Sequence, residues 1–464
     1  MTSRQWFIRN GGRDEALRQR LLERATELDW HPPYMKVRYD NWVNGLNGDW
    51  LVSRQRFFGV SVPVWYPLQP DGTPDHSTPL VPDETRLPID PTTDVPEGYT
   101  EDQRGAPGGF VGDPDVMDTW ATSSVTPQII CGWEDDPALF AATFPMDLRP
   151  QGPEIIRTWL FATLLRSHLE HDVLPWRHTT INGWILDPDR KKMSKSRGNV
   201  VTPMALLEEF GSDAVRYWAC NGRPGTDTAL DTGVMKIGRR LAIKILNASK
   251  FALGRLGEAP APGLEAVHEA LDVALLARLA ELVQATTAAH EGFDYARALE
   301  LTEGFFWSFC DDYVELVKSR AYGEGSSAGS DSARATLALA LSALHRLFAP
   351  FLPFVTEEVW SWWQDGSVHL APWPTVAEVG PHAGAELAVL DVAAQVLGAV
   401  RREKTAHKRS MRARVSTLTV IAPPAMLLDV EAARHDLTDA GGVDDLVTEE
   451  GEALAVNVEL ADEA

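Results

Sequence analysis

The sequence predicts an α/β domain, followed by an all-α helical bundle and a small α/β tail. Three observations support this order. Roughly the first 230 residues combine short apolar runs with Gly and Pro turn signals, which is typical of mixed α/β structure. Apolar residues then recur at helical spacing through residues 275–348, and the segment STLTVIAPP (416–424) begins a β-containing tail.

Length and composition exclude several classes of protein. The 464 residues are 44% apolar and 23% charged, which is ordinary for a globular chain of about three domains at roughly 150 residues each. Three widely separated cysteines offer neither a disulfide framework nor a zinc knuckle, so we expect no protein-bound metal. The N-terminus has no signal-like apolar run, and no stretch approaches 18 consecutive apolar residues. We therefore expect a cytoplasmic protein with no membrane partner.

The α/β part is expected over residues 1–232, with a connecting basic helix over 233–256. Nine prolines fall between Pro67 and Pro107, and this density excludes a regular helix or a central strand there. We interpret that stretch as a surface excursion inserted into the α/β unit. By contrast, IIRTWLFATLLRSH (155–168) has helical apolar spacing.

The helical bundle is expected over residues 257–385 and the C-terminal helix with its acidic tail over 386–464. GEAPAPG (257–263) is typical of a linker, and EGSSAGSDS (324–332) of a flexible loop between two helices. Between them, Leu275, Leu279 and Leu282 show the spacing of a bundle helix. A helix before the tail is expected to end in the basic run RREKTAHKRSMRAR.

The net charge of −23 is unevenly distributed. From Asp429 onward there are twelve acidic residues and one arginine, which accounts for 11 of the surplus negative charges. Two basic clusters stand elsewhere: six Lys or Arg between Lys236 and Arg255 without an acid, and seven against one Glu between Arg401 and Arg414. Such clusters are either solvated helix faces or phosphate-binding surfaces.

The strongest local motif is KKMSKSRGN, Lys191–Asn199, directly after the apolar segment INGWILD. Four cations, small hydroxylated residues and a glycine make a loop that can fold over a polyphosphate. Its lysines supply positive charge and its backbone amides supply hydrogen-bond donors. A solvated turn is the simpler interpretation of a lysine-rich loop taken alone.

The string KMSKS resembles the second signature of class I aminoacyl-tRNA synthetases. Three further segments, DWLVSRQRFFG (49–59), DPDVMDTWATSS (113–124) and RPQGPEIIRTW (149–159), look like the core of the valyl, isoleucyl and leucyl subgroup. NWVNGLNGDWLVSRQRFFG and GWILDPDRKKMSKSRGNVVTP look most like the bacterial valyl enzymes. The resemblance covers essentially the whole chain and implies a class I nucleotide-binding, Rossmann-like catalytic domain and an anticodon-binding bundle.

The resemblance implies roles for individual residues. The triphosphate of ATP, which enters with Mg²⁺ as a substrate, would meet Lys192, Met193, Ser194, Lys195 and Ser196. Gly152 and Glu154 match the element that binds the adenosine ribose, although the family pattern has Asp where this chain has Glu. Trp120 and Trp159 match the two tryptophans that wall the amino-acid pocket; rigid rings grip a branched side chain at low entropic cost. Trp159 also fits a plain core position in an apolar helix.

The bundle and its basic clusters are the expected tRNA-binding surface, with an exposed aromatic residue as a stacking platform. The cluster of Trp307, Asp311 and Tyr313 lies in the segment that resembles the anticodon-binding bundle. The expected RNA contacts are Lys236, Arg239, Arg240, Lys244, Arg401, Arg402, Lys408 and Arg409.

None of the twelve histidines stands in an HxGH pattern, the first class I signature. The resemblance implies a valine–tRNA ligase that acts on valine, ATP and tRNA(Val). Without HxGH, we expect this chain to be a fragment, or one half of a split enzyme whose separate N-terminal half carries HIGH and the editing domain. The alternative is a non-catalytic tRNA-binding paralogue, and a third is a remnant without function. Physics alone does not exclude isoleucine, because one methylene changes binding by only about 1–3 kcal/mol.

Overall fold

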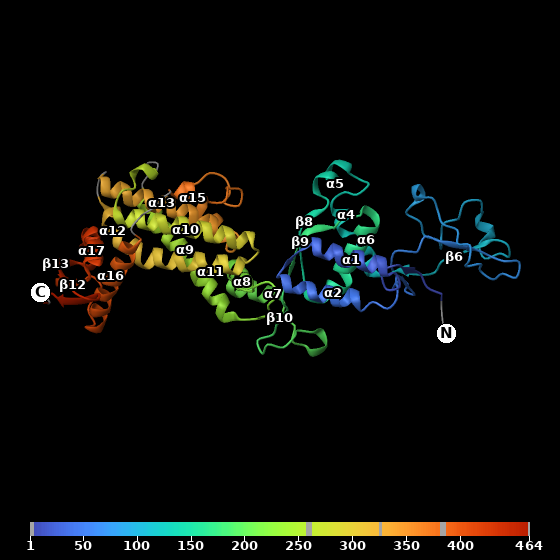
Figure 1. Cartoon of the computed structure of the whole chain (residues 1–464), viewed down its shortest axis with the longest axis horizontal. Helices are drawn as coiled ribbons and strands as arrows, with labels where there is room; N and C mark the ends of the chain where they lie inside the picture. The colour runs from blue at the N-terminus through green and yellow to red at the C-terminus, as the bar shows by residue number, and fades with distance from the viewer. Residues whose placement is uncertain (1–3, 257–261, 324–326, 381–386, 463–464) are drawn as a thin grey trace. The chain divides into compact units, whose positions relative to one another are not determined.

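The computed structural model describes residues 4–256, 262–323, 327–380 and 387–462, apart from the side chains of Lys195 and Arg255. The chain forms two compact units, Met1–Trp184 with Pro224–Asp227, and Ile185–Arg223 with Thr228–Ala464. We describe each unit by itself (Figure 1). In this division the KMSKS segment belongs to the second unit. The sequence had predicted that the α/β part, with the KMSKS segment in it, extends to residue 232. The predicted domain limits stay predictions.

The first unit is built on a three-stranded parallel sheet. Strand β9 (Trp176–Ile181) lies between β2 (Asp29–His31) and β8 (Met146–Gln151), and Leu148 is opposite His178 in the register. Within the described residues, β8 pairs with β9 alone. Parallel strands need covered faces. The covering helices are α1 (Glu15–Glu27), α2 (Lys36–Asn44) and α6 (Phe161–His171).

These helices and strands share one hydrophobic core. Its fully buried members include Leu21, Tyr39, Leu160 and Trp176. Helix α1 begins where Asp14 Oδ1 accepts a hydrogen bond from the Leu17 amide at 3.0 Å, which satisfies one of the free donors of the first turn. The α/β fold class predicted for this part of the chain is confirmed.

The helix predicted over 155–168 is present, but it begins irregularly. A 3₁₀ turn (Pro153–Ile155) leads into a π-helical turn (Ile156–Leu160) and then into α6. A π turn inserts one extra residue into the helical repeat and often marks a functional site. The insertion falls on the segment that carries Trp159, a residue of the predicted amino-acid pocket.

The proline-rich stretch is an excursion between two short antiparallel strands, β5 (Trp65–Pro67) and β6 (Phe110–Gly112). Its only helical pieces are two 3₁₀ turns of three residues each. The Trp65 indole donates to the carbonyls of Pro91 and Asp94 at 3.2 and 3.0 Å, and so ties the excursion to the strand pair. The expected absence of long helices and strands is therefore seen over 67–107.

The second unit contains the helical bundle. Its principal helices are α9 (Thr232–Leu256), α10 (Ala270–Glu291), α11 (Tyr295–Ser308), α12 (Val314–Tyr322), α13 (Ala328–Phe348), α14 (Pro353–Trp360) and α16 (Ala388–Ala406). They enclose a continuous apolar core in which Leu279, Leu316 and Leu341 are almost fully buried. No helix among the described ranges is long and apolar enough to cross a membrane.

The loop predicted over 324–332 is wrong at its C-terminal end. Residues 324–326 lie outside the described residues, but α13 already begins at Ala328, and Ser327 caps it by accepting from the Ser330 amide at 3.2 Å. The Ser332 hydroxyl donates to the buried Asp272 carboxylate at 2.6 Å. Ser327 therefore caps the helix and Ser332 anchors it to Asp272, so both serines belong to the start of a helix and not to a loop.

The predicted α/β tail is a three-stranded sheet with two helices. Strand β12 (Val415–Ala422) lies between β13 (Val443–Glu450), which is parallel to it, and β14 (Ala455–Leu460), which is antiparallel. Helices α17 (Pro424–Ala432) and α18 (Arg434–Gly441) connect β12 to β13. The tail packs on the bundle, and α18 lies against α12 and α16.

Candidate functional site

The KMSKS segment is a loop that leaves a very short strand. Strand β10 (Ile185–Leu186) pairs in parallel with β11 (Thr228–Ala229), and Leu186 forms an antiparallel bridge with Lys192. The loop between these points therefore returns to the strand it leaves. Helices α7 (Pro203–Phe210) and α8 (Ser212–Cys220) follow it in the same unit.

A carboxylate and an amide hold the base of this loop. Asp187 accepts from Asn199 Nδ2 at 2.8 Å and from the Lys191 amide at 2.7 Å. Asn199 also accepts from the Ser194 amide at 3.0 Å and donates to the Lys192 carbonyl at 3.3 Å. The hydrogen bond from Asn199 and the bond from Lys191 lower the pKa of Asp187. The Asp187–Asn199 pair closes the ends of the motif, and no local sequence pattern predicted it.

The hydroxyl groups of the motif lie together. Ser194 Oγ and Ser196 Oγ are 3.3 Å apart, and both residues belong to the loop that Asn199 closes. Gly198 follows with φ +66°, a left-handed conformation that glycine adopts without steric cost. The side chain of Lys195 lies outside the described residues. The predicted triphosphate-binding residues Lys192, Met193, Ser194 and Ser196 therefore share one closed loop.

A pocket of about 600 Å³ lies in the first unit, on the side of α2 and α6. Trp120 lines it together with Thr158 and Phe161. At its wall the buried Asp118 carboxylate accepts from the Trp50 indole at 3.2 Å and pairs with Arg54 at 3.1 Å. The structure thus places one of the two predicted pocket tryptophans at a cavity of ligand size.

Asp49 is a residue of this pocket that the sequence analysis missed. It lines the cavity, and its buried Oδ1 atom has no hydrogen-bond partner among the described residues. A buried carboxylate oxygen without a partner costs free energy, so such an atom in a cavity indicates a missing cationic or hydrogen-bonding group. Asp49 is the single acidic residue of the DWLVSRQRFFG segment, and no sequence signal marked it as a residue of the pocket.

Trp159 lies in the core beside this pocket. It is 7% exposed, its indole donates to the Ser123 carbonyl at 3.0 Å, and its ring packs on Trp176 with centroids 5.6 Å apart. The Arg149 guanidinium lies 4.4 Å from the Trp159 ring centroid on another side. Trp120 belongs to the short helix α3 (Thr119–Ser123), and the Trp159 indole donates to the last residue of that helix. Trp120 lines the cavity, whereas Trp159 is not among its lining residues.

The predicted ribose-binding pair is close together. A Cβ atom on Gly152 would lie 2.7 Å from Glu154 Oε2, so glycine is what permits this approach. The same Oε2 accepts from the Trp184 indole at 2.8 Å. The longer Glu side chain thus folds back over Gly152 and is fixed by a tryptophan, which orients the carboxylate.

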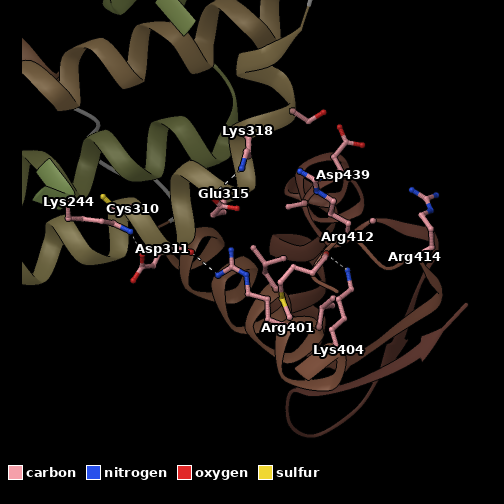
Figure 2. A pocket seen from close by; sticks show the side chains of 16 residues that line it. Lys244, Cys310, Asp311, Glu315, Lys318, Arg401, Lys404, Arg412, Arg414 and Asp439 are labelled. Carbon is pink, nitrogen blue, oxygen red and sulfur yellow. Dashed lines mark hydrogen bonds and ion pairs between the residues drawn. The ribbon is translucent and has the colours of Figure 1, made fainter. Parts of the chain in front are cut away.

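A basic pocket of about 880 Å³ lies on the helical bundle (Figure 2). Six cations line it, Lys244, Lys318, Arg401, Lys404, Arg412 and Arg414, against three carboxylates, Asp311, Glu315 and Asp439. Local charge is therefore positive on a chain whose net charge is −23. We call this site the basic pocket. It brings Lys244 of the first basic cluster, on α9, together with four members of the second cluster, Arg401, Lys404, Arg412 and Arg414, from α16 and the segment after it.

Asp311 organises one side of the basic pocket. It pairs with Lys244 at 2.9 Å, and its carbonyl accepts from Arg401 Nη1 at 2.8 Å. Burial opposes the charge of Lys244, but the hydrogen bond to Asp311 raises the pKa of this lysine. Lys244 also lies 5.6 Å from the Trp307 ring centroid. Of the expected Trp307–Asp311–Tyr313 cluster, Tyr313 is instead fully buried.

The other predicted RNA contacts are more scattered. Lys236, Arg239 and Arg240 line a second hollow of about 820 Å³ on α9, together with apolar residues. Arg402 and Lys408 are exposed but line neither hollow, whereas Arg409 donates to the Ala461 carbonyl at 3.2 Å. The sequence analysis missed Lys318, which α12 supplies from outside the two basic clusters. No group of three His, Cys, Asp or Glu in the described ranges could hold a metal.

Two family models match the chain. Residues 1–231 match "tRNA synthetases class I (I, L, M and V)", and residues 272–417 match "Anticodon-binding domain of tRNA ligase". Valine–tRNA ligase of Thermobifida fusca is 63% identical over 99% of this chain and 52% of its own length. That of Salinispora tropica is 58% identical over 97% of this chain and 54% of its own length. The chain spans about half the length of these curated relatives.

Solved structures show the same fold at low identity. An Agrobacterium radiobacter K84 LeuRS in complex with tRNA and LeuAMS has a TM-score of 0.57 and 19% identity, over 89% of this chain and 51% of that one. Methionyl-tRNA synthetase of Mycobacterium tuberculosis with methionyl-adenylate has a TM-score of 0.54 and 21% identity, over 74% of this chain and 60% of that one. The KMSKS loop, the anticodon-type bundle and these matches agree: the chain belongs to the class I tRNA synthetases of the isoleucine, leucine, methionine and valine group.

Proposed function

We propose that this chain supplies the KMSKS and anticodon-binding parts of a valine–tRNA ligase. The observation that carries the proposal is the closed KMSKS loop in a chain 63% identical to a valine–tRNA ligase over 99% of its length. Valine, ATP with Mg²⁺, and tRNA(Val) are the proposed substrates. The HxGH signature would come from an N-terminal half, either on a separate chain or on the same one.

In the proposed reaction, a valine carboxylate oxygen attacks the α-phosphorus of ATP. The new P–O bond forms as the bond to the β-phosphate oxygen breaks, and pyrophosphate leaves with the negative charge. Lys192 and Lys195 would stabilise that charge, with Ser194 and Ser196 as hydroxyl donors. Glu154 would accept from the ribose hydroxyls, and Trp120 would contact the valine side chain. A hydroxyl of the tRNA 3′ end then attacks the valyl carbonyl, and AMP leaves.

Catalysis of this kind depends on position more than on covalent chemistry, and a misplacement of about 1 Å costs on the order of a hundredfold in rate. The Asp187–Asn199 pair fixes where the loop donors lie. We therefore propose that this pair positions the KMSKS loop for the adenylation step. The tRNA would bind through the basic pocket and the basic face of α9, whose cations release counterions from RNA phosphates.

Valine-dependent exchange of pyrophosphate into ATP tests the proposal. The chain is mixed with the part of the Thermobifida fusca relative that it does not cover. We expect exchange only in the mixture, and a reduction of about 10- to 100-fold when Asn199→Ala is used, because the loop then loses its closing hydrogen bonds. Asn457→Ala, in the tail, is the matched control and should exchange like the parent.

Two outcomes count against the proposal. A well-folded complex of the two parts that shows no valine-dependent exchange would overturn the ligase assignment. If such a chain still bound tRNA in a salt-sensitive manner, the non-catalytic tRNA-binding paralogue would replace it.

A further inference from the structure

Lys404 is a buried cation in the wall of the basic pocket. It is 2% exposed, although it stands in the most basic stretch of the chain. Its Nζ donates to the Gly441 carbonyl at 2.7 Å and to the Met411 carbonyl at 3.1 Å. A buried ammonium group is tolerated only when such acceptors replace its water. Lys404 thus joins α16 to the end of α18 and to the segment that follows α16.

That segment, residues 407–414, is named here the basic loop. It begins with a Schellman turn at the end of α16: the Lys408 amide donates to the Thr405 carbonyl at 3.0 Å, and the Arg409 amide to the Lys404 carbonyl at 2.8 Å. Lys408 takes the left-handed conformation, with φ 53°. Lys404 therefore binds the basic loop twice, through its own carbonyl and through its ammonium group.

The far end of the basic loop is fixed on the α/β tail. Arg409 Nη2 donates to the Ala461 carbonyl at 3.2 Å, and the Ala461 amide donates to the Arg414 carbonyl at 3.1 Å. Arg414 also forms an ion pair with Asp444 of β13. The basic loop is thus held in place by hydrogen bonds and an ion pair to the α/β tail.

The basic loop carries two of the pocket's cations. Arg412 and Arg414 line the pocket, as Figure 2 shows. The Arg412 guanidinium is exposed and has no ion-pair partner among the described residues. Its charge is therefore available for a phosphate. The Lys404 ammonium group is less available for a phosphate, because it is buried and already donates to two carbonyls.

We propose that Lys404 is a positioning residue for RNA: it holds the basic loop against the tail so that Arg412 and Arg414 meet the phosphates of the bound strand. This inference rests on the proposed binding of tRNA at the basic pocket. It assigns the α/β tail a role in RNA binding, although 11 of the chain's surplus negative charges lie from Asp429 onward. The acidic tail would hold the basic loop in place, and the arginines of the loop would contact the phosphates.

The test compares Lys404→Met and Lys404→Arg with Lys318→Met in the full chain. Lys318 lines the same pocket but pairs with Glu315 at 3.6 Å, and among the described residues it has no hydrogen bond or ion pair to the basic loop. Amide hydrogen exchange over 408–414 reports the position of the loop without RNA. Binding of tRNA(Val) over a range of salt concentrations reports how many phosphates are neutralised, at about 0.7–0.9 in slope per contact.

Lys404→Met should speed exchange over 408–414 by at least tenfold and lower the salt slope by about 1.4–1.8, because two arginines lose their place. Lys404→Arg, which keeps a donor cation, should stay within about threefold of the parent in exchange. Lys318→Met should leave exchange unchanged and lower the slope by at most about 1. A Lys404→Met chain that melts like the parent and keeps its exchange protection or its salt slope would overturn the inference. A parent chain that binds no tRNA would instead overturn the proposed function, and exchange would still report on Lys404.

Discussion

Among single residues, Asp187 and Asn199 hold the base of the KMSKS loop, because the Asp187 carboxylate accepts from Asn199 Nδ2 at 2.8 Å and from the Lys191 amide at 2.7 Å. KMSKS is a literal string, so its lysines and serines stood out, whereas Asn199 and Asp187 close the loop through contacts over 12 residues that no local pattern announces. Trp159 shows the converse. Its place in an apolar helix fitted a core residue as well as a pocket wall, and in the structure its ring contacts both Trp176 and the Arg149 guanidinium.

His345 gives a residue-scale prediction about pH. It is buried in the bundle, where its Nε2 lies 2.8 Å from Ser249 Oγ, and burial lowers its pKa to about 3. The folded state therefore keeps His345 neutral, while the unfolded chain binds a proton below a pKa near 6.5. Above pH 6.5 the burial of neutral His345 therefore costs no stability. Below that pH the free energy of unfolding falls, and at pH 5 the loss due to His345 is about 2 kcal/mol.

Urea unfolding at pH 7 and pH 5 checks this sign. His345→Gln has no titrating group at position 345. Between pH 7 and pH 5 its free energy of unfolding should therefore fall by about 2 kcal/mol less than that of the parent chain. Equal losses in the parent and in His345→Gln would show that another group carries the acid sensitivity.

At the scale of elements, buried charge fixes the tail to the bundle. Arg320 of α12 pairs with Asp272 of α10 at 2.9 Å and with Asp436 of α18 at 2.7 Å, and all three are nearly inaccessible to solvent. The Tyr313 hydroxyl also donates to Asp272 at 2.8 Å. Periodicity predicted α10 and the helices around it, but not this cluster, because its members are 48 and 116 residues apart.

Removal of Arg320 should be costly for this reason. Arg320→Met leaves two buried carboxylates without their cation and should lower the free energy of unfolding by about 3–5 kcal/mol. The triple variant Arg320→Met, Asp272→Asn, Asp436→Asn removes the charges together and should regain much of that loss. Chemical denaturation measures both. An Arg320→Met chain as stable as the parent would mean that the cluster does not fix the tail.

At the scale of the whole molecule, the order of α/β part, bundle and tail followed from periodicity and turn signals. Where the structure differs from the prediction, contacts with residues far along the chain determine the local structure. Residues 328–332 had the composition of a loop, yet Ser327 and Ser332 find an amide and a carboxylate that make them part of a helix start. The two basic clusters were visible as charge, but the packing of α16 in the bundle decides that Lys244 of the first cluster shares a pocket with Arg401 of the second, while Lys236 lines another hollow.

We propose that this chain carries the KMSKS loop and the tRNA-binding part of a valine–tRNA ligase. Attachment of radiolabelled valine to tRNA(Val) tests both parts in one measurement, with the chain combined with the remaining half of the Thermobifida fusca relative. We predict valyl-tRNA only when both parts are present, and a large loss when the tRNA(Val) anticodon is replaced. Well-folded parts that associate but form no valyl-tRNA, or that charge the altered tRNA equally well, would contradict the claim.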